Sequence, residues 1–486
     1  MKKLLESFFC LMAVIFNCSA SAQNITGTWE GELDIQGKHI PVVFHVAKDV
    51  SDKLSASFDS PSQNVFNLKC SDVIVKEDSV SILLSAVNIR YTGQLNKDYQ
   101  QLNGLWFQGL GSVPLALKKT SEHAWVVKEK RPQTPMKPYP YELEEVDFTN
   151  NDQSVRYGGT LTFPKIAFST ETNVPAKYPA IILITGSGQQ DRDETLFGHK
   201  PFAVIADHLT KMGFAVLRVD DRGIGKTTGN YEQASTLDFA KDVEAGINFL
   251  AKHKRINKQK MGLLGHSEGG MIAQIVASER KDVKFIIMLA APGISTIDLM
   301  QHQTEAWGIS EGMPVAEAKA KGFLLHTVWT EGKNNNDQAT AVKNIRFKTD
   351  SMFNNLDPGT LKRLKSGDST AVDMQVKHEL NALKGNWLKY FINYDPQSTL
   401  QKLNCMVLAI NGNKDVQVNA GANLEGIRSA LAKSKSKQYD IVQLSGLNHL
   451  FQNCVKCSPS EYHELEETFS PIALQTISIW LERNVK

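Results

Sequence analysis

The sequence carries almost no net charge. Its 54 lysine and arginine residues are balanced by 52 aspartate and glutamate residues, so the formal charge is only +2 at pH 7. Binding to nucleic acid or to an anionic membrane surface is typically accompanied by a clear excess of positive charge. The composition therefore gives no reason to expect nucleic acid as a partner.

Long apolar runs are also scarce. The run FFCLMAVIF (Phe8–Phe16) is too short to span a bilayer as a helix, and no later stretch is continuously apolar for long enough. Two lysines precede this run and Ala20-Ser21-Ala22 follows it, which is the order of a secretory signal peptide and its cleavage site. We predict that residues 1–22 are a signal peptide and that the mature protein is secreted or periplasmic, without stable membrane insertion. Lipid attachment at Cys18 is the alternative, although the residues before it are not small.

Cysteine is rare as well, with 6 among 486 residues. After the predicted signal peptide the chain keeps Cys70, Cys405, Cys454 and Cys457. The last two are spaced for a tight disulfide, which an oxidising compartment permits. A redox centre would require a thioredoxin-like βαβ context, and a zinc site would require two more ligands. Neither is evident in the sequence. We expect a disulfide or unpaired thiols here, and no metal site.

Residues 24–120 consist of short alternating runs separated by Gly, Asn and Asp, which is typical of an antiparallel sheet or a small barrel. Trp29, Trp106 and Phe107 could stack on a ligand, but aromatic side chains in such a domain more often form its core. We predict a β-rich N-terminal domain without a catalytic cluster. The proline-rich residues 121–140 then predict a linker.

From residue 141 the pattern changes to apolar strands separated by helical stretches, after a leading antiparallel pair. This alternation predicts parallel βαβ units. It stops over residues 292–403, which are mostly helix-like, and then resumes. We predict an α/β fold with a doubly wound, mostly parallel sheet built from residues 141–291 and 404–486. Residues 292–403 would form a helical cap over the strand ends, where such sheets bind ligands.

The segment GLLGHSEGGMIAQ contains the pattern G-x-S-x-G at Gly265–Gly269, between an apolar strand and a helix. In a nucleophile elbow the chain turns sharply from strand to helix and exposes the serine oxygen. The glycines are needed because the serine backbone is strained and strand and helix approach closely. Glycine and serine also occur in ordinary turns, but the strand and helix on either side favour Ser267 as a nucleophile.

A serine hydroxyl needs a base to remove its proton, and the base needs an acid to orient it. Asp415 follows the resumed strand in AINGNKDVQV, and His449 follows the last strand in QLSGLNHLFQ. Each alone could be an ordinary turn or surface residue. Together they stand in the order Ser, acid, His at strand ends beside the elbow, so we predict a Ser267–His449–Asp415 triad. His266 points the wrong way along the elbow to act as the base.

An oxyanion hole needs two backbone donors. We predict the N–H of Glu268, directly after the nucleophile, and that of Ser187 or Gly188 in the loop TGSGQQDRDE. The segment GIGKTTG (223–229) is similar to a phosphate loop, but Asp220 stands where that motif requires its first glycine. The run VDDRGIGKT (219–227), which follows a strand, is expected to brace the active-site face instead.

The region from 141 onwards resembles the α/β-hydrolase superfamily, in particular secreted bacterial esterases close to the serine aminopeptidase-like branch. The segments YGGTLTFP, GSGQQDRDE, DDRGIGKTTG, GHSEGG, GNKDVQV and NHLFQ carry this resemblance. It implies Ser267 as nucleophile, Asp415 as acid and His449 as base. One departure is Thr185, where many members have a histidine before the oxyanion glycine.

These observations predict a secreted serine hydrolase that cleaves small-molecule carboxylic esters, with short acyl or aryl groups, and needs no metal or organic cofactor. A serine peptidase with the same triad is one alternative, because fold and triad do not fix the substrate. A ligand-binding protein with a vestigial hydrolase unit is the other. A peptidase would need a carboxylate for the substrate's amino terminus, and Glu305, Glu311 and Glu317 are the candidates in the cap.

Overall fold

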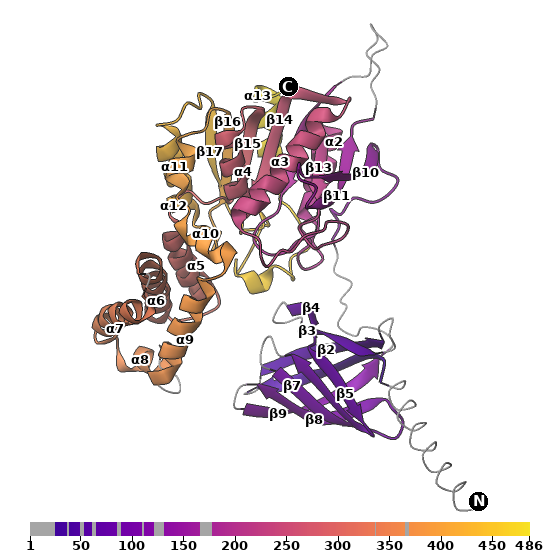
Figure 1. Cartoon of the computed structure of the whole chain (residues 1–486), viewed down its shortest axis with the longest axis vertical. Coiled ribbons are helices and arrows are strands. Elements are labelled where there is room, and N and C mark those ends of the chain that lie inside the picture. The colour runs from indigo at the N-terminus through magenta and orange to yellow at the C-terminus, as the bar shows by residue number, and fades with distance from the viewer. Residues whose placement is uncertain are drawn as a thin grey trace, which may run out of the picture. The chain divides into compact units, whose positions relative to one another are not determined.

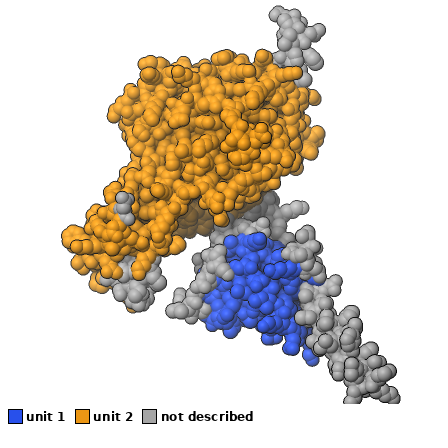
Figure 2. Space-filling model, viewed as in Figure 1, with its two compact units in different colours: residues 1–129 blue, residues 130–486 orange. Residues whose placement is uncertain are grey.

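The chain forms two compact units in the computed structural model, residues 1–129 (unit 1) and residues 130–486 (unit 2), coloured separately in Figure 2. The structure describes residues 25–35, 38–48, 53–60, 65–84, 89–108, 111–120, 131–165, 177–335, 337–364 and 369–486. The predicted signal peptide lies outside these residues. Within them, no helix combines the length and the apolar character that a membrane crossing requires.

Unit 1 is a nine-stranded antiparallel sheet in the order β4-β3-β2-β1-β9-β8-β7-β6-β5. Its strands are β1 (Gly27–Ile35), β2 (Lys38–Lys48), β3 (Leu54–Ser60), β4 (Val65–Lys69), β5 (Asp72–Lys76), β6 (Ser79–Leu84), β7 (Ile89–Leu95), β8 (Gln101–Gln108) and β9 (Gly111–Thr120). The sheet curls, since β3 and β5 from opposite ends of this order are in contact.

The inner face of this sheet carries the aromatic side chains that the sequence predicts for a core. Trp29 and Trp106 are buried beside Phe44 and Tyr91. Phe107 points to the other face of β8, because neighbouring residues of a strand alternate between faces. There its ring is half-buried and the guanidinium of Arg90 lies 4.5 Å from the ring centre.

Unit 2 contains an eight-stranded sheet in the order β10-β11-β13-β12-β14-β15-β16-β17, shown in Figure 1. Its strands are β10 (Glu142–Thr149), β11 (Arg156–Phe163), β12 (Tyr178–Ile184), β13 (Ala215–Val219), β14 (Ile256–His266), β15 (Val283–Leu289), β16 (Met406–Gly412) and β17 (Tyr439–Leu444). The first two pair antiparallel, and the six from β13 to β17 run parallel. This is the mostly parallel sheet, with a leading antiparallel pair, that the sequence predicts.

Helices cover both faces of this sheet, which explains why its strands are apolar throughout. The covering helices are α2 (Pro201–Lys211) and α13 (Pro471–Asn484) on one face, and α3 (Thr236–Lys252), α4 (Glu268–Glu279) and α12 (Ala420–Leu431) on the other. Along β12, Ile181 and Leu183 pack into the core beneath α2 and α13. Ile182 and Ile184 alternate with them and pack into the opposite core.

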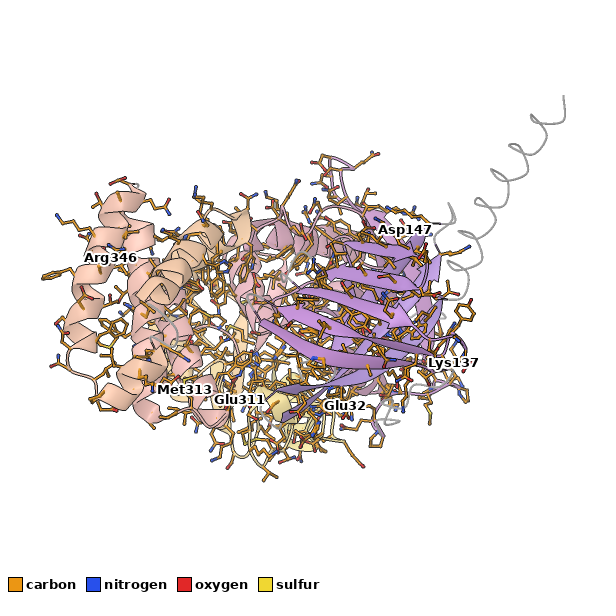
Figure 3. All side chains as sticks on the ribbon, turned by 90° about the horizontal axis from the view of Figure 1, so that it is seen from below. Glu32, Lys137, Asp147, Glu311, Met313 and Arg346 are labelled. Carbon is orange, nitrogen blue, oxygen red and sulfur yellow. A yellow bond between two sulfur atoms is a disulfide. The ribbon has the colours of Figure 1, made fainter. Side chains whose placement is uncertain are left out.

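A helical insertion separates β15 from β16. It contains α5 (Thr296–Ser310), α6 (Val315–Asn334), α7 (Gln338–Phe353), α8 (Pro358–Leu364), α9 (Ser369–Ala382), α10 (Asn386–Asn393) and α11 (Pro396–Leu400). Figure 1 shows α6 to α9 gathered in a lobe, with α5 and α10 leading back to the sheet. In Figure 3, Glu311 and Met313 mark the turn between α5 and α6, and Arg346 lies apart from them on α7.

The proline-rich residues 121–140, predicted as a linker, are only partly described by the structure. Residues 121–130 lie outside the described residues, whereas 131–140 are held on unit 2. The guanidinium of Arg131 donates to the carbonyl oxygens of Phe197, at 2.7 Å, and Leu465, at 3.0 Å. The side chain of Gln133 donates to Phe469 and accepts from the backbone N–H of Thr468. These ten residues therefore belong to unit 2.

Candidate active site

The nucleophile elbow forms at the end of β14. Ser267 stands between the last residue of that strand and the first residue of α4, with φ 53° and ψ −117°. This backbone conformation is rare for a residue with a side chain. A Cβ atom added at Gly265 would lie 2.0 Å from the carbonyl oxygen of Gly269, and one added at Gly269 would lie 2.1 Å from that of Ile184. Any larger residue at either position would push strand and helix apart.

The two residues predicted as acid and base are hydrogen-bonded to each other. Nδ1 of His449 lies 2.8 Å from Oδ2 of Asp415, and both side chains are buried. The other oxygen of Asp415 accepts from the backbone N–H groups of Gln417 and Val418, each at 2.8 Å. These bonds fix the carboxylate, so Nδ1 of His449 donates to it and Nε2 is the ring nitrogen turned away from Asp415.

The loop after β12 holds three successive amides with different roles. The N–H of Gly186 donates to the Glu194 carboxylate at 2.8 Å, and the N–H of Gly188 donates to the Tyr231 hydroxyl at 3.0 Å. Between them, the N–H of Ser187 has no acceptor among the described residues. Of the two residues considered for the second oxyanion donor, Ser187 is thus the one whose amide is available to a ligand.

The side chain of Glu268 connects this loop to the helical insertion. Its Oε2 accepts from the Ser187 hydroxyl at 2.6 Å. Its Oε1 accepts from the Thr236 hydroxyl at 2.6 Å and from the indole N–H of Trp387 at 2.9 Å. The residue is only 3% exposed, and three donors compensate the cost of burying its charge. Trp387 lies on α10, so the insertion reaches the carboxyl edge of the sheet through this contact.

A pocket opens beside Gly186 and Glu268, with an empty volume of about 630 Å³ that includes its mouth. Ile182, Phe239 and Val243 form part of its apolar wall, and Asp221 contributes a carboxylate. Asp221 accepts from the Thr185 hydroxyl at 2.9 Å and from the N–H of Gln190 at 2.8 Å. Burial raises the pKa of Asp221 to about 7, with a smaller contribution from nearby carboxylates.

The run VDDRGIGKT (219–227) braces this edge, as the sequence predicts. Asp220 accepts from the guanidinium of Arg192 at 2.6 Å, and Arg222 donates to Asp242 at 2.6 Å. These two ion pairs tie the loops after β12 and β13 to each other and to α3. Sequence reasoning missed Glu194 and Trp387. For Glu194 the only signal in the sequence is that it ends the charge-rich run QQDRDE after a buried strand. For Trp387 it is an aromatic residue in a helix after the polar part of the insertion.

The three glutamates considered for a substrate's amino terminus have other partners. Glu305 accepts from Gln301 at 2.9 Å, and Glu317 lies 3.0 Å from the ammonium group of Lys321. Glu311 accepts from the hydroxyl and the N–H of Ser460, and Figure 3 shows it beside the yellow C-terminal segment.

Cys454 and Cys457 form a disulfide. Glu461 accepts from the backbone N–H groups of residues 455–457 within its loop. Cys70 and Cys405 are free and buried, and burial raises the pKa of each thiol to about 12. Of the two outcomes expected for the C-terminal pair, the structure has the disulfide.

Comparison with known proteins agrees with this architecture. The family model "Serine aminopeptidase, S33" (Hydrolase_4) matches residues 200–348. Esterase EstD of Thermotoga maritima is 29% identical over 164 residues, which cover 34% of this chain and 36% of the esterase. The elbow and the order of the sheet give residues 131–486 an α/β-hydrolase fold, and the chain is similar to the serine aminopeptidase family over residues 200–348.

Other relatives of this α/β-hydrolase match more distantly. The uncharacterized protein YfhR of Escherichia coli K12 is 27% identical over 153 residues, which cover 31% of this chain and 48% of YfhR. The structure of Est1E from Butyrivibrio proteoclasticus with ferulic acid bound has a TM-score of 0.41 and 17% identity, over 70% of this chain and 99% of that one. The chain spans about a third to a half of the length of the curated relatives it matches. The family match includes Ser267 but ends before Asp415 and His449.

Proposed function

We propose that this α/β-hydrolase is a secreted serine hydrolase that cleaves carboxylic esters through an acyl-enzyme. The observation that carries the proposal is the buried hydrogen bond between Asp415 and His449, at strand ends beside the strained Ser267. Strained backbone at a strand end and an imidazole oriented by an acid are two features of an activated serine; the third, a hydrogen bond from Ser267 Oγ to Nε2 of His449, is not made among the described residues and would form when substrate binds.

In the proposed reaction, Nε2 of His449 takes the hydroxyl proton of Ser267 while the oxygen attacks the ester carbonyl. The tetrahedral oxyanion accepts hydrogen bonds from the N–H groups of Ser187 and Glu268. His449 then gives its proton to the leaving alcohol, which departs as the acyl-enzyme forms. A water molecule attacks the acyl carbonyl with His449 again as base, and the carboxylic acid is released with Ser267 restored.

Asp415 holds the imidazole tautomer and stabilises the imidazolium that forms in each half-reaction. The linked side chains of Ser187 and Glu268 keep the two amide donors in place, because Ser187 Oγ donates to Glu268 Oε2 at 2.6 Å. Preorganised donors of this kind stabilise the transition state without further movement. No step requires a metal or an organic cofactor.

The proposed substrates are small-molecule esters with short acyl or aryl groups. The pocket beside Gly186 and Glu268 favours apolar groups, since its wall is mostly apolar, and it adjoins the elbow through Glu268, although Ser267 and His449 are not among its lining residues. Esterase activity is also named for EstD. A peptidase is the second candidate because the matching family model carries that name. The ion pair of Glu317 with Lys321 and the bonds of Glu311 to Ser460 count against these two carboxylates as the site of an amino terminus, whereas Glu305 is engaged by the amide of Gln301 on one oxygen.

The test compares two substrate panels on one preparation of the full chain. Nitrophenyl acetate and butyrate should turn over readily and long-chain esters poorly, while aminoacyl and prolyl nitroanilides should react little. The Ser267→Ala variant is the blank for both panels. Faster turnover of the anilides would assign the protein to the peptidases. No turnover of either panel, together with no labelling of Ser267 by a fluorophosphonate, would leave a ligand-binding protein.

A further inference from the structure

A second buried acid–histidine pair lies beside the proposed triad. Nδ1 of His266 is 3.0 Å from Oε1 of Glu194, and Nε2 of His266 is 3.0 Å from the carbonyl oxygen of His449. His266 is 6% exposed and Glu194 is 1% exposed. The rings of His266 and His449 are 4.7 Å apart between their centres. The proposed reaction uses neither residue of this pair.

The partners of His266 determine where its protons lie. A backbone carbonyl oxygen can only accept, so Nε2 of His266 must carry a proton. Oε1 of Glu194 faces Nδ1 and also accepts from the N–H of Gly186 at 2.8 Å. A carboxylate can only accept, so opposite a carboxylate Nδ1 would donate as well and both ring nitrogens would be protonated. The arrangement would then be an imidazolium–carboxylate ion pair, with two buried charges next to each other.

The charged groups around His266 support this state. Burial alone would lower the pKa of His266, but the charge and hydrogen bond of Glu194 outweigh it and raise that pKa above its usual value. The carbonyl oxygen of His449 and the charge of Asp415 act in the same direction. These groups come from the loops after β12, β17 and β16, the three loops that pack around the ring.

The pair also joins the loops that the reaction needs. Glu194 binds the start of the oxyanion loop through Gly186, and His266 directly precedes Ser267 and holds the backbone of His449. Gly186 lies so close to the elbow that an added Cβ would be 3.3 Å from Cβ of Ser267. Glu194, Ser267 and Phe451 all have positive φ, at 53°, 53° and 60°. Each of these backbone conformations is uncommon for a residue with a side chain and is held in place by the surrounding contacts.

We propose that Glu194 and a doubly protonated His266 act as positioning residues, holding the oxyanion loop and the His449 loop around Ser267. The proposal rests on the proposed serine hydrolase function. Neither residue touches the substrate in this scheme. Their effect reaches the reaction through the backbone of Gly186 and of His449, and small displacements of reacting groups reduce rates strongly.

The first experiment reads the protonation state without using activity. The protein is labelled with ¹⁵N-histidine, and long-range ¹H–¹⁵N spectra are recorded from pH 6 to 8. The signals of His266, one of 12 histidines, are assigned by their loss in His266→Gln. We expect both ring nitrogens to be protonated over this range, and Glu194→Gln to convert the ring to a neutral tautomer. A neutral His266 in the wild-type protein at pH 7 would overturn the ion pair.

The second experiment measures the rate at which a fluorophosphonate probe labels Ser267. Glu194→Gln and His266→Gln should each slow labelling by about 10- to 100-fold, and should lower kcat for nitrophenyl acetate far more than they change KM. Asp193→Asn is the matched control, because Asp193 lies in the same turn but pairs with Arg218, whereas the hydrogen bonds of His266 among the described residues go to Glu194 and to the backbone of His449. Thermal unfolding of all three variants verifies that they fold.

The two proposals fail in different ways. If the wild-type protein is not labelled at Ser267, the hydrolase function fails, and the spectra still decide the protonation of His266. If the wild-type protein is labelled and both pair variants react as fast as it does, the positioning role is wrong. Equal slowing by Asp193→Asn would also contradict it, because the effect would then come from the turn as a whole.

Discussion

The two acid–histidine pairs of unit 2, Asp415–His449 and Glu194–His266, are alike at Nδ1 of the histidine ring and differ at Nε2. His449 and His266 each direct Nδ1 to a buried carboxylate, at 2.8 Å from Asp415 and 3.0 Å from Glu194. Nε2 of His266 is bound to a carbonyl oxygen at 3.0 Å, whereas Nε2 of His449 has no hydrogen-bond partner within the described part of the chain.

This difference separates a base from a fixed donor. A histidine acts as a general base only when one ring nitrogen is free to gain and lose a proton. His449 meets this condition, while both nitrogens of His266 are bound to acceptors. Closeness to Ser267 in sequence is therefore a poor guide, since His266 is its neighbour and His449 is far along the chain. The partner of the second nitrogen decides which role a histidine can take.

Removing the hydroxyl of Ser267 should have the largest effect. It tests whether this hydroxyl is the group that His449 deprotonates. We expect Ser267→Ala to reduce kcat/KM for nitrophenyl acetate by about 10⁴-fold or more, because the acyl-enzyme can no longer form. Steady-state kinetics with a circular dichroism spectrum as the folding control measures this. Activity near the wild-type value would contradict the mechanism.

Asp415→Asn should have the next largest effect, because it replaces the acceptor on Nδ1 of His449 with a donor, an arrangement found in neither acid–histidine pair. The asparagine oxygen would take the N–H groups of Gln417 and Val418, so its NH₂ group would face Nδ1 of His449 and select the wrong tautomer. We expect a loss of about 10³- to 10⁴-fold in kcat with little change in thermal unfolding. A silent Asp415→Asn beside a damaging substitution of another acid would move the role elsewhere.

The elements of the first pair could be predicted from sequence because each rests on a local pattern. An apolar strand, two glycines flanking a serine and an apolar helix define the elbow, and Asp415 and His449 follow strands whose carboxyl ends meet at one edge. Glu194 could not be found in this way. The run Asp191–Glu194 has several charges, and which of them turns inward depends on the positive φ at Glu194 and on His266, 72 residues away.

The same reasoning applies to the contacts that place the insertion. Trp387 could be assigned to a helix, but its bond to Glu268 spans 119 residues and follows from tertiary packing alone. The proline-rich residues 131–140 have the composition of a linker, yet Arg131 and Gln133 bind backbone carbonyls of unit 2. The composition of residues 131–140 predicts an extended chain, but it does not predict which groups that chain binds.

Asp221 offers a comparison with both paired acids, because this buried carboxyl group has no ion pair with a lysine, arginine or histidine in the part of the chain that the structure describes. The raised pKa means that the folded state holds a proton that the unfolded state has released between about pH 4 and pH 7. This contribution to stability is present below pH 4 and is lost as pH rises through 7. We expect Asp221→Asn to gain stability relative to wild type by about 1 kcal/mol or more between pH 4 and pH 8. Urea unfolding at both pH values measures it, and a constant difference would contradict it.

Trp387→Phe should have a smaller effect, since it alters a contact outside both pairs. The substitution removes the indole N–H bond to Glu268 and keeps an aromatic ring stacked on Phe391, whose centre lies 5.2 Å away. We expect KM for nitrophenyl butyrate to rise a few-fold while kcat stays within about twofold, because Ser187 and Thr236 still bind Glu268. A large fall in kcat would show that Trp387 also positions the oxyanion donors.

Removing unit 1 should have the smallest effect, because both pairs and every hydrogen bond described for them lie in unit 2. The described start of that unit is Arg131, whose guanidinium holds the loops at Phe197 and Leu465. A chain that begins at Arg131 should therefore keep kcat/KM for nitrophenyl acetate within about twofold of the full chain, whereas one that begins at Tyr141 should unfold at a lower temperature for lack of several hydrogen bonds. Kinetics and thermal unfolding of both chains test this. A folded chain from Arg131 without activity would mean that residues 24–120 help to build the site.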